Sequence, residues 1–166
     1  KKIQIVGYDL GKRMINLAKR KINIKKQKKN KIDVKLICQD ITKIKKYKNA
    51  DLFLLILTFP FFSYEKRKKI LKQINKSLNV GGCLIIVDKI RSKNSNFEDI
   101  LNQMYFDFKL EMKLTEKEII KKAKSLRSSM HLLNQETTEN LFKQCNFKKY
   151  EIFFKCFNFV GYFLTK

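Results

Sequence analysis

Three short segments carry side chains that could bind a nucleoside-like ligand, and each follows a run of mostly apolar residues. Asp9 follows the first run, and its carboxylate could accept both hydroxyls of a ribose. Asp40 and Ile41 follow the second run, where an acidic side chain beside a free backbone amide suits the edge of an adenine. Residues 58–62 follow the third run and offer an aromatic wall. Each segment also has a structural explanation, because aspartates often cap helices or form turns and phenylalanines usually lie in the core.

These segments lie at the ends of predicted β-strands in an open α/β sheet. The periodicity predicts the order β-α-β-β-α-β, then helices, then a strand pair. The run 52–57 is continuously apolar, which predicts a strand covered on both faces. In such sheets ligands bind beyond the carboxyl ends of the strands. The expected strands are at 3–8, 34–38, 52–57, 83–87, 148–154 and 159–165. Helical spacing begins at Met14 in a Lys-rich stretch that reaches about Lys29, and further helices are expected at 64–78, 97–108, 116–130 and 138–146.

The predicted helices have recognisable terminal residues. Ser63 is expected to cap the helix that follows it, and Gly81 and Gly82 to end that helix in a left-handed turn. Thr115 and Glu118 are expected to form a capping box at the start of the helix that follows them. The last helix is expected to begin at Thr137 or Thr138 and to end at Asn146 in a left-handed backbone conformation.

Composition limits the class of protein. Hydrophobic residues make up 44% of the 166 residues, which excludes a disordered tail. The longest apolar run, 50–62, is too short and too interrupted to span a bilayer. The four cysteines lack C-x-x-C spacing and His131 is the only histidine, so we expect packing cysteines and no metal site. We expect one partial domain over 1–166, with a helical insertion at about 94–130, in a cytoplasmic protein with no membrane contact.

The net charge of +23 permits nucleic-acid binding without establishing it. Lysine greatly outnumbers arginine, although arginine binds phosphate bidentately and would be favoured by selection for RNA contact. Lys, Ile, Asn and Phe, which dominate the composition, have codons rich in A and T. An A+T-rich genome therefore accounts for most of the bias, and salt-dependent, nonspecific RNA affinity follows from it.

The strand-end residues together resemble a Rossmann-like class I S-adenosylmethionine-dependent methyltransferase fold. The segments Asp-Phe-Lys at 107–109 and Phe-Phe-Lys-Cys-Phe-Asn-Phe at 153–159 resemble, more closely, the bacterial carboxy-S-adenosylmethionine synthases. The similarity is ungapped from about Leu52 to Phe159 and looser toward Lys2. It implies S-adenosylmethionine as cofactor, a terminal antiparallel hairpin and a homodimer. It also implies that the sequence is a fragment, without the first strand of the fold and its glycine-rich turn.

The resemblance implies a specific reaction and specific residues. Family members convert S-adenosylmethionine and prephenate to carboxy-S-adenosylmethionine and phenylpyruvate, and a companion carboxymethyltransferase then modifies the wobble uridine of tRNA. Asp9 and Leu10 fall on the family's ribose-binding pair, and Asp40 and Ile41 on its adenine-binding pair. Prephenate loses its carboxylate as its ring aromatises, and the methyl carbon of the sulfonium captures it. The protein contributes positioning and electrostatics, and no catalytic acid or base is assigned.

Two cofactor or substrate positions depart from the family pattern. Ile56 stands where the family has an asparagine and cannot form a side-chain hydrogen bond. Ala123 stands where the family has an arginine that holds the added carboxylate. Lys122, Lys124 and Arg127 lie nearby, and Arg127 is the better substitute because residues four apart share a helix face.

Three functions remain open from the sequence. The first is a carboxy-S-adenosylmethionine synthase. The second is a methyltransferase that uses S-adenosylmethionine to methylate tRNA, which the fold and the basic surface permit. The third is a degenerate remnant or a basic RNA-binding module, which the departures at Ile56 and Ala123 permit.

Overall fold

The chain divides into two compact units, residues 1–45 and residues 46–166. The computed structural model describes residues 3–26 and 32–166. The end of the predicted helix that reaches about Lys29 therefore lies outside the described residues. The prediction that 1–166 form one partial domain stays a prediction, and the two units are described separately.

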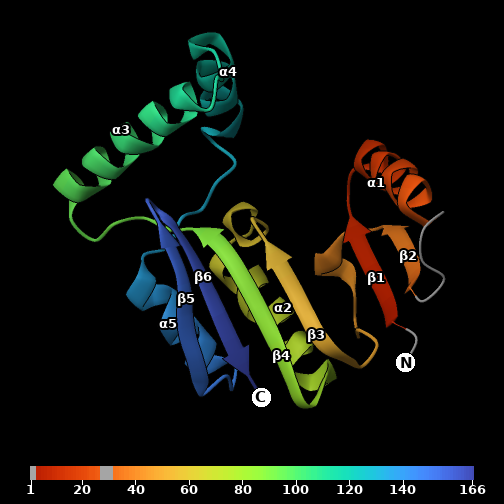
Figure 1. Cartoon of the computed structure of the whole chain (residues 1–166). Helices are drawn as coiled ribbons and strands as arrows, with labels where there is room; N and C mark the ends of the chain where they lie inside the picture. The colour runs from red at the N-terminus through yellow and green to blue at the C-terminus, as the bar shows by residue number, and fades with distance from the viewer. Residues whose placement is uncertain (1–2, 27–31) are drawn as a thin grey trace. The chain divides into compact units, whose positions relative to one another are not determined.

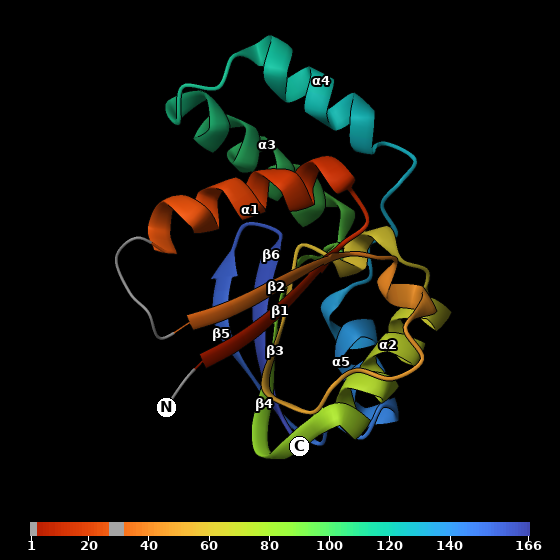
Figure 2. The ribbon, with the colours of Figure 1, turned by 90° about the vertical axis from the view of Figure 1, so that its right-hand side faces the viewer.

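The first unit is a βαβ arrangement. It contains β1 (Ile3–Asp9), α1 (Lys12–Lys26), β2 (Ile32–Cys38) and the 3-10 turn η1 (Ile41–Lys43). The two strands run parallel, and their register carries through to the pair Asp9 and Cys38. Figures 1 and 2 show the α1 crossover that a parallel pair requires. The carboxyl ends of both strands therefore lie at one edge.

The second unit contains a four-stranded sheet in the order β3-β4-β6-β5. β3 and β4 are parallel, whereas β6 pairs antiparallel with both β4 and β5. The predicted terminal hairpin is confirmed, and its turn lies at Phe157 and Asn158. The elements are β3 (Ala50–Ile56), η2 (Phe59–Phe61), α2 (Tyr64–Ser77), β4 (Leu78–Lys89), α3 (Ser95–Glu111), α4 (Glu116–Leu126), α5 (Gln135–Gln144), β5 (Lys149–Cys156) and β6 (Phe159–Thr165).

The core of this unit lies between the sheet and the two helices α2 and α5, which cover one face (Figures 1 and 2). Alternate residues of β4 and β6 point into it, and α2 contributes the i, i+4 pair Ile70 and Ile74. Phe142 of α5 packs edge-to-face on Tyr162 of β6, with ring centroids 5.1 Å apart. The largest fully buried apolar side chains are Phe59, Ile70, Leu71, Ile74, Leu78, Leu84, Ile86, Leu141, Phe142, Phe147, Tyr162 and Leu164.

The opposite face of β3 is open, which corrects the prediction of a strand covered on both faces. Leu52, Leu54 and Ile56 are each about half exposed, whereas Leu55, which points toward the helices, is buried. β3 is also an edge strand of its sheet. The apolar run at 52–57 is therefore a parallel strand, and within the described part of this unit helices cover only one of its faces.

Local interactions at the helix ends confirm some predicted signals and correct others. Thr115 and Glu118 form a full capping box, and Asn146 has a φ of 64°. Ser63 lies at the N-cap of α2 but its side chain makes no capping hydrogen bond. The prediction that Gly81 and Gly82 end α2 is wrong, because the chain is already extended at Leu78. Gly81, with a φ of 77°, lies instead where the register between β3 and β4 is irregular.

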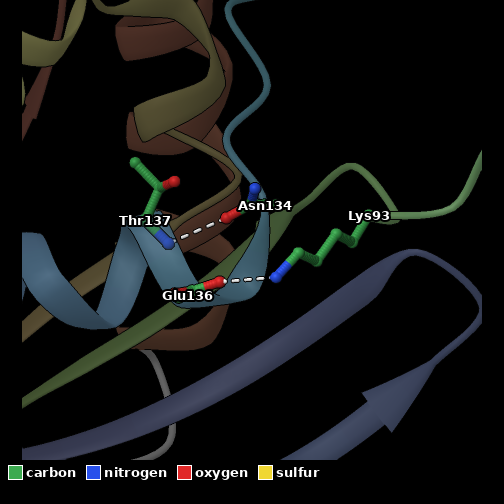
Figure 3. A network of polar contacts seen from close by, with 4 residues as sticks. All are labelled: Lys93, Asn134, Glu136 and Thr137. Carbon is green, nitrogen blue, oxygen red and sulfur yellow. Dashed lines mark hydrogen bonds and ion pairs between the residues drawn. The ribbon is translucent and has the colours of Figure 1, made fainter.

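The start of α5 is capped by Asn134 rather than by Thr137 or Thr138. The Asn134 side chain accepts a hydrogen bond from the Thr137 amide at 2.8 Å (Figure 3). Lys93, in the segment that precedes α3, forms an exposed ion pair with Glu136 at 3.0 Å. An exposed pair of this kind adds little stability.

The helices α3 and α4 extend away from the sheet of this unit (Figure 1). They lie inside the range 94–130 expected for a helical insertion, and α3 buries no residue. Within residues 3–26 and 32–166, no helix combines the length and apolar character that a membrane crossing needs.

We predict that Phe142→Ala lowers the free energy of unfolding by about 3–5 kcal/mol, because it leaves a cavity at the centre of the core. Chemical denaturation followed by circular dichroism measures this change. Phe97→Ala is the matched control, since Phe97 is 63% exposed and its loss should cost little. Equal effects of the two substitutions would contradict the assignment of the core.

Candidate functional site

The carboxyl edge of the first unit brings Asp9 and Asp40 onto neighbouring strands. Asp9 ends β1, Asp40 follows β2 by two residues, and the Gln39 amide donates to the Asp9 carbonyl at 3.0 Å. The sequence predicted this juxtaposition, because parallel strands share one carboxyl edge. The two aspartates therefore lie at the same edge of this strand pair.

Asp9 is oriented by the backbone that follows it. Its Oδ1 accepts a hydrogen bond from the Gly11 amide at 2.6 Å. A Cβ atom at Gly11 would lie 3.1 Å from that oxygen, so the turn fits glycine best. The side chain of Leu10 is 73% exposed beside it. A carboxylate held by one oxygen keeps the other available, and this acceptor suits the hydroxyl donors of a ribose diol.

Asp40 is the N-cap of η1. Its Oδ1 accepts hydrogen bonds from the amide and the hydroxyl of Thr42, at 2.8 and 2.7 Å. Asp40 is therefore a helix cap, as the structural explanation of this aspartate expects. A cap is compatible with a role in binding adenine, because it fixes the backbone of Ile41. The sequence analysis assigned Asp9 to the ribose of a nucleoside, and Asp40 and Ile41 to its base. These assignments stay predictions.

The third strand end, in the second unit, is shaped by the backbone. Ile56 ends β3, Leu57 has a φ of 51°, and its amide donates to the Val87 carbonyl at 2.7 Å. The predicted aromatic wall is divided: Phe59 is buried in the core, whereas Phe61 is 46% exposed. Only part of the segment 58–62 can therefore contact a ligand.

A buried carboxylate that the sequence analysis missed holds this segment in place. Asp88, which is 6% exposed, accepts hydrogen bonds from the amides of Thr58 (3.1 Å) and Phe59. Its place in the otherwise apolar segment 84–88 was the signal available in the sequence. Because burial outweighs the attraction of Arg67 and these two hydrogen bonds, the pKa of Asp88 is raised to about 7.

Arg67 of α2 connects the same segment to the chain ahead of α5. Its Nε donates to the Phe62 carbonyl at 2.8 Å, and its guanidinium also donates to the His131 carbonyl. The His131 amide in turn donates to the Pro60 carbonyl at 2.7 Å. Arg67 is 5% exposed, so this buried network fixes two loops at the carboxyl edge of the sheet.

The proposed substrate-carboxylate residues lie on α4. Ala123 is exposed on this helix, and Arg127 is its exposed C-cap. Lys122 and Lys124 are exposed as well. In the described part of the chain, no hydrogen bond or ion pair holds the Arg127 side chain. Its assignment stays a prediction. Nor do the described residues gather three metal-ligating side chains at one place.

Comparisons with known proteins agree with the predicted fold and family. The family described as a methyltransferase domain matches residues 1–86. A carboxy-S-adenosyl-L-methionine synthase of Staphylococcus epidermidis is 36% identical over 134 residues, 81% of this chain and 58% of that protein. The synthase of Idiomarina loihiensis is 28% identical over 163 residues, 98% of this chain and 65% of that protein. The chain thus spans less than two thirds of either relative.

Among solved structures, human N-acetylserotonin methyltransferase in complex with SAM covers 99% of this chain with a TM-score of 0.59. Its sequence identity is 13%, and the match spans 40% of that protein, so the likeness concerns the fold alone. The Rossmann-like methyltransferase fold is therefore confirmed. The family and this fold also agree with S-adenosylmethionine as the cofactor.

We predict that Asp88→Asn flattens the dependence of stability on pH. The folded protein keeps the Asp88 proton up to about pH 7, whereas the unfolded chain loses it near pH 4. Between about pH 4 and pH 7, rising pH therefore lowers the free energy of unfolding, by up to about 4 kcal/mol in total. Above about pH 7, Asp88 makes no further difference to it. Urea denaturation at pH 4 to 8 measures the difference between wild type and variant. Asp99→Asn, at an exposed site, is the control, and parallel curves for wild type and Asp88→Asn would contradict the assignment.

Proposed function

Because the chain belongs to the methyltransferase-domain family, we propose that the protein containing it is a carboxy-S-adenosyl-L-methionine synthase. The carrying observation is the 36% identity to a synthase of that name. The proposed reaction converts S-adenosylmethionine and prephenate to carboxy-S-adenosylmethionine and phenylpyruvate. S-adenosylmethionine supplies the methyl carbon that receives the carboxylate. Prephenate loses this carboxylate and its ring hydroxide as the ring becomes aromatic, and the hydroxide leaves as water with the proton that the methyl carbon gives up.

The residues of this chain would act mainly by positioning. Asp9, whose Oδ1 is held by the Gly11 amide, would accept the ribose hydroxyls. Asp40 and Ile41 would contact the adenine, and Ile56 could contribute only apolar contact, since its side chain has no polar atom. A site of this kind lowers the barrier by holding the reactants together and by stabilising charge rather than by moving protons.

The product would serve tRNA indirectly, through a companion carboxymethyltransferase that modifies the wobble uridine. This places the reaction in the cytoplasm. Direct tRNA contact is not required, and the excess of lysine over arginine does not favour it.

A second copy of the chain is the proposed partner, and the surface of α3 and α4 supports it. α3 has no buried residue within the chain, and a groove of about 250 Å³ lies between the two helices, lined by Phe106, Leu110, Glu116, Ile119 and Ile120. Exposed apolar side chains gathered on one pair of helices are typical of protein–protein interaction sites. The exposed apolar residues of this surface are Phe97, Ile100, Met104, Phe106, Phe108, Leu110, Met112, Leu114 and Ile120.

We predict that the full-length protein, purified without added cofactor and then denatured, releases carboxy-S-adenosylmethionine. Mass spectrometry of the released small molecule identifies it. Recovery of S-adenosylmethionine without the added carboxylate, or of no nucleoside, would contradict the proposed activity and favour an ordinary methyltransferase or a non-catalytic remnant.

We predict that Asp9→Ala in the full-length protein weakens binding of S-adenosylhomocysteine at least 100-fold, because the ribose hydroxyls lose their acceptor. Isothermal titration calorimetry measures the affinity, and circular dichroism verifies folding. Asp33→Ala, an exposed aspartate within β2, is the control. Unchanged affinity of the Asp9 variant would refute this site.

A further inference from the structure

Two lysines from different elements meet at one aromatic ring beside the carboxyl end of β4. The Nζ of Lys109 lies 3.8 Å from the centroid of the Tyr105 ring, and the Nζ of Lys89 lies 5.9 Å from it. Lys89 is the last residue of β4, and the other two residues are on α3. The sequence analysis assigned no role to either lysine.

Aromatic side chains of α3 and the terminal hairpin pack against one another beside these lysines. The Tyr105 ring lies 5.8 Å from that of Phe157 and 5.1 Å from that of Phe159. The Phe108 ring lies 5.6 Å from that of Phe157. Lys89 is paired with Phe159 in the β4–β6 register. All of these rings retain some exposure, so a planar ligand could contact them.

Asn102 fixes the position of Lys89. Its Oδ1 accepts from the Lys89 Nζ at 3.1 Å and from the buried Asn158 amide at 3.2 Å. Its own amide donates to Glu98 at 3.2 Å. This polar network therefore preorganises Lys89.

The charges of the cluster do not balance. Glu98 attracts Lys89, but among the described residues Lys109 has no ion pair. Burial lowers the pKa of both lysines, and the charge of Lys89 lowers that of Lys109 further. Two cations held together with one acidic neighbour favour an anionic ligand.

We propose that Lys89 and Lys109, with the ring of Tyr105, form the binding site for a carboxylate-bearing ligand with a planar ring. Lys89 is the last residue of β4, so the site lies at the carboxyl edge of this sheet. This inference rests on the proposed function, for which it identifies the residues that hold the substrate carboxylate. Arg127, exposed at the end of α4, has no comparable setting.

Steady-state kinetics of the full-length protein tests this assignment. Lys109→Gln should raise the KM for prephenate at least 10-fold while the affinity for S-adenosylhomocysteine stays unchanged, and Lys109→Arg should recover part of the loss. Lys121→Gln, at an exposed lysine of α4, is the control. A merely structural role would instead change both affinities together, and a KM equal to wild type would overturn the proposal.

A direct titration separates this proposal from the proposed function. Phenylpyruvate is added without cofactor, and binding is followed by NMR of the full-length protein. Binding by wild type that weakens at least 10-fold in Lys109→Gln would support the site even if prephenate were not turned over. Equal binding by the two proteins would overturn the site even if turnover were found.

Discussion

The need to cover one apolar face of the four-stranded sheet determines which side chains remain for chemistry at its edge. Alternate residues of β4 point toward α2 and α5, and Leu84 and Ile86 fill that core. The same alternation places Asp88 on the covered side and Lys89 on the other. One residue is therefore buried with the backbone amides of Thr58 and Phe59, and the next can meet α3.

Burial of Asp88 carries a cost that its neighbours offset only in part. A carboxylate removed from water needs hydrogen bonds and a nearby cation, and this one has two amides and Arg67. The same hydrogen bonds from Thr58 and Phe59 order the segment after β3, and this ordering accompanies the cost of burial. Arg67 extends this order to the chain at His131, so two loops distant in sequence are fixed by one buried network. Such a network is a source of specificity more than of net stability.

Local patterns predicted the elements well, whereas interactions between distant residues could not be read from them. The order of the elements along the chain, the hairpin turn and the capping box at Thr115 follow from spacings of a few residues. The cap at Asn134 was missed because two threonines shortly after it offered equally good signals. The open face of β3 was missed because an apolar run does not reveal how many layers cover it. Asp9 and Asp40 were accessible to prediction because strand ends share an edge, but the Lys89–Lys109 cluster depends on how α3 packs against the hairpin.

The proposed Lys89–Lys109 cluster differs physically from the arginine that the family pattern has at the position of Ala123. An arginine holds a carboxylate through a planar fork with two parallel hydrogen bonds, so one residue supplies both charge and orientation. Lysine ammonium groups act as point charges, and two of them separated across a ring supply charge with little orientation. In the proposed site the orientation would come from elsewhere, and the rings of Tyr105, Phe157 and Phe159 are placed to supply it by stacking against a planar ligand.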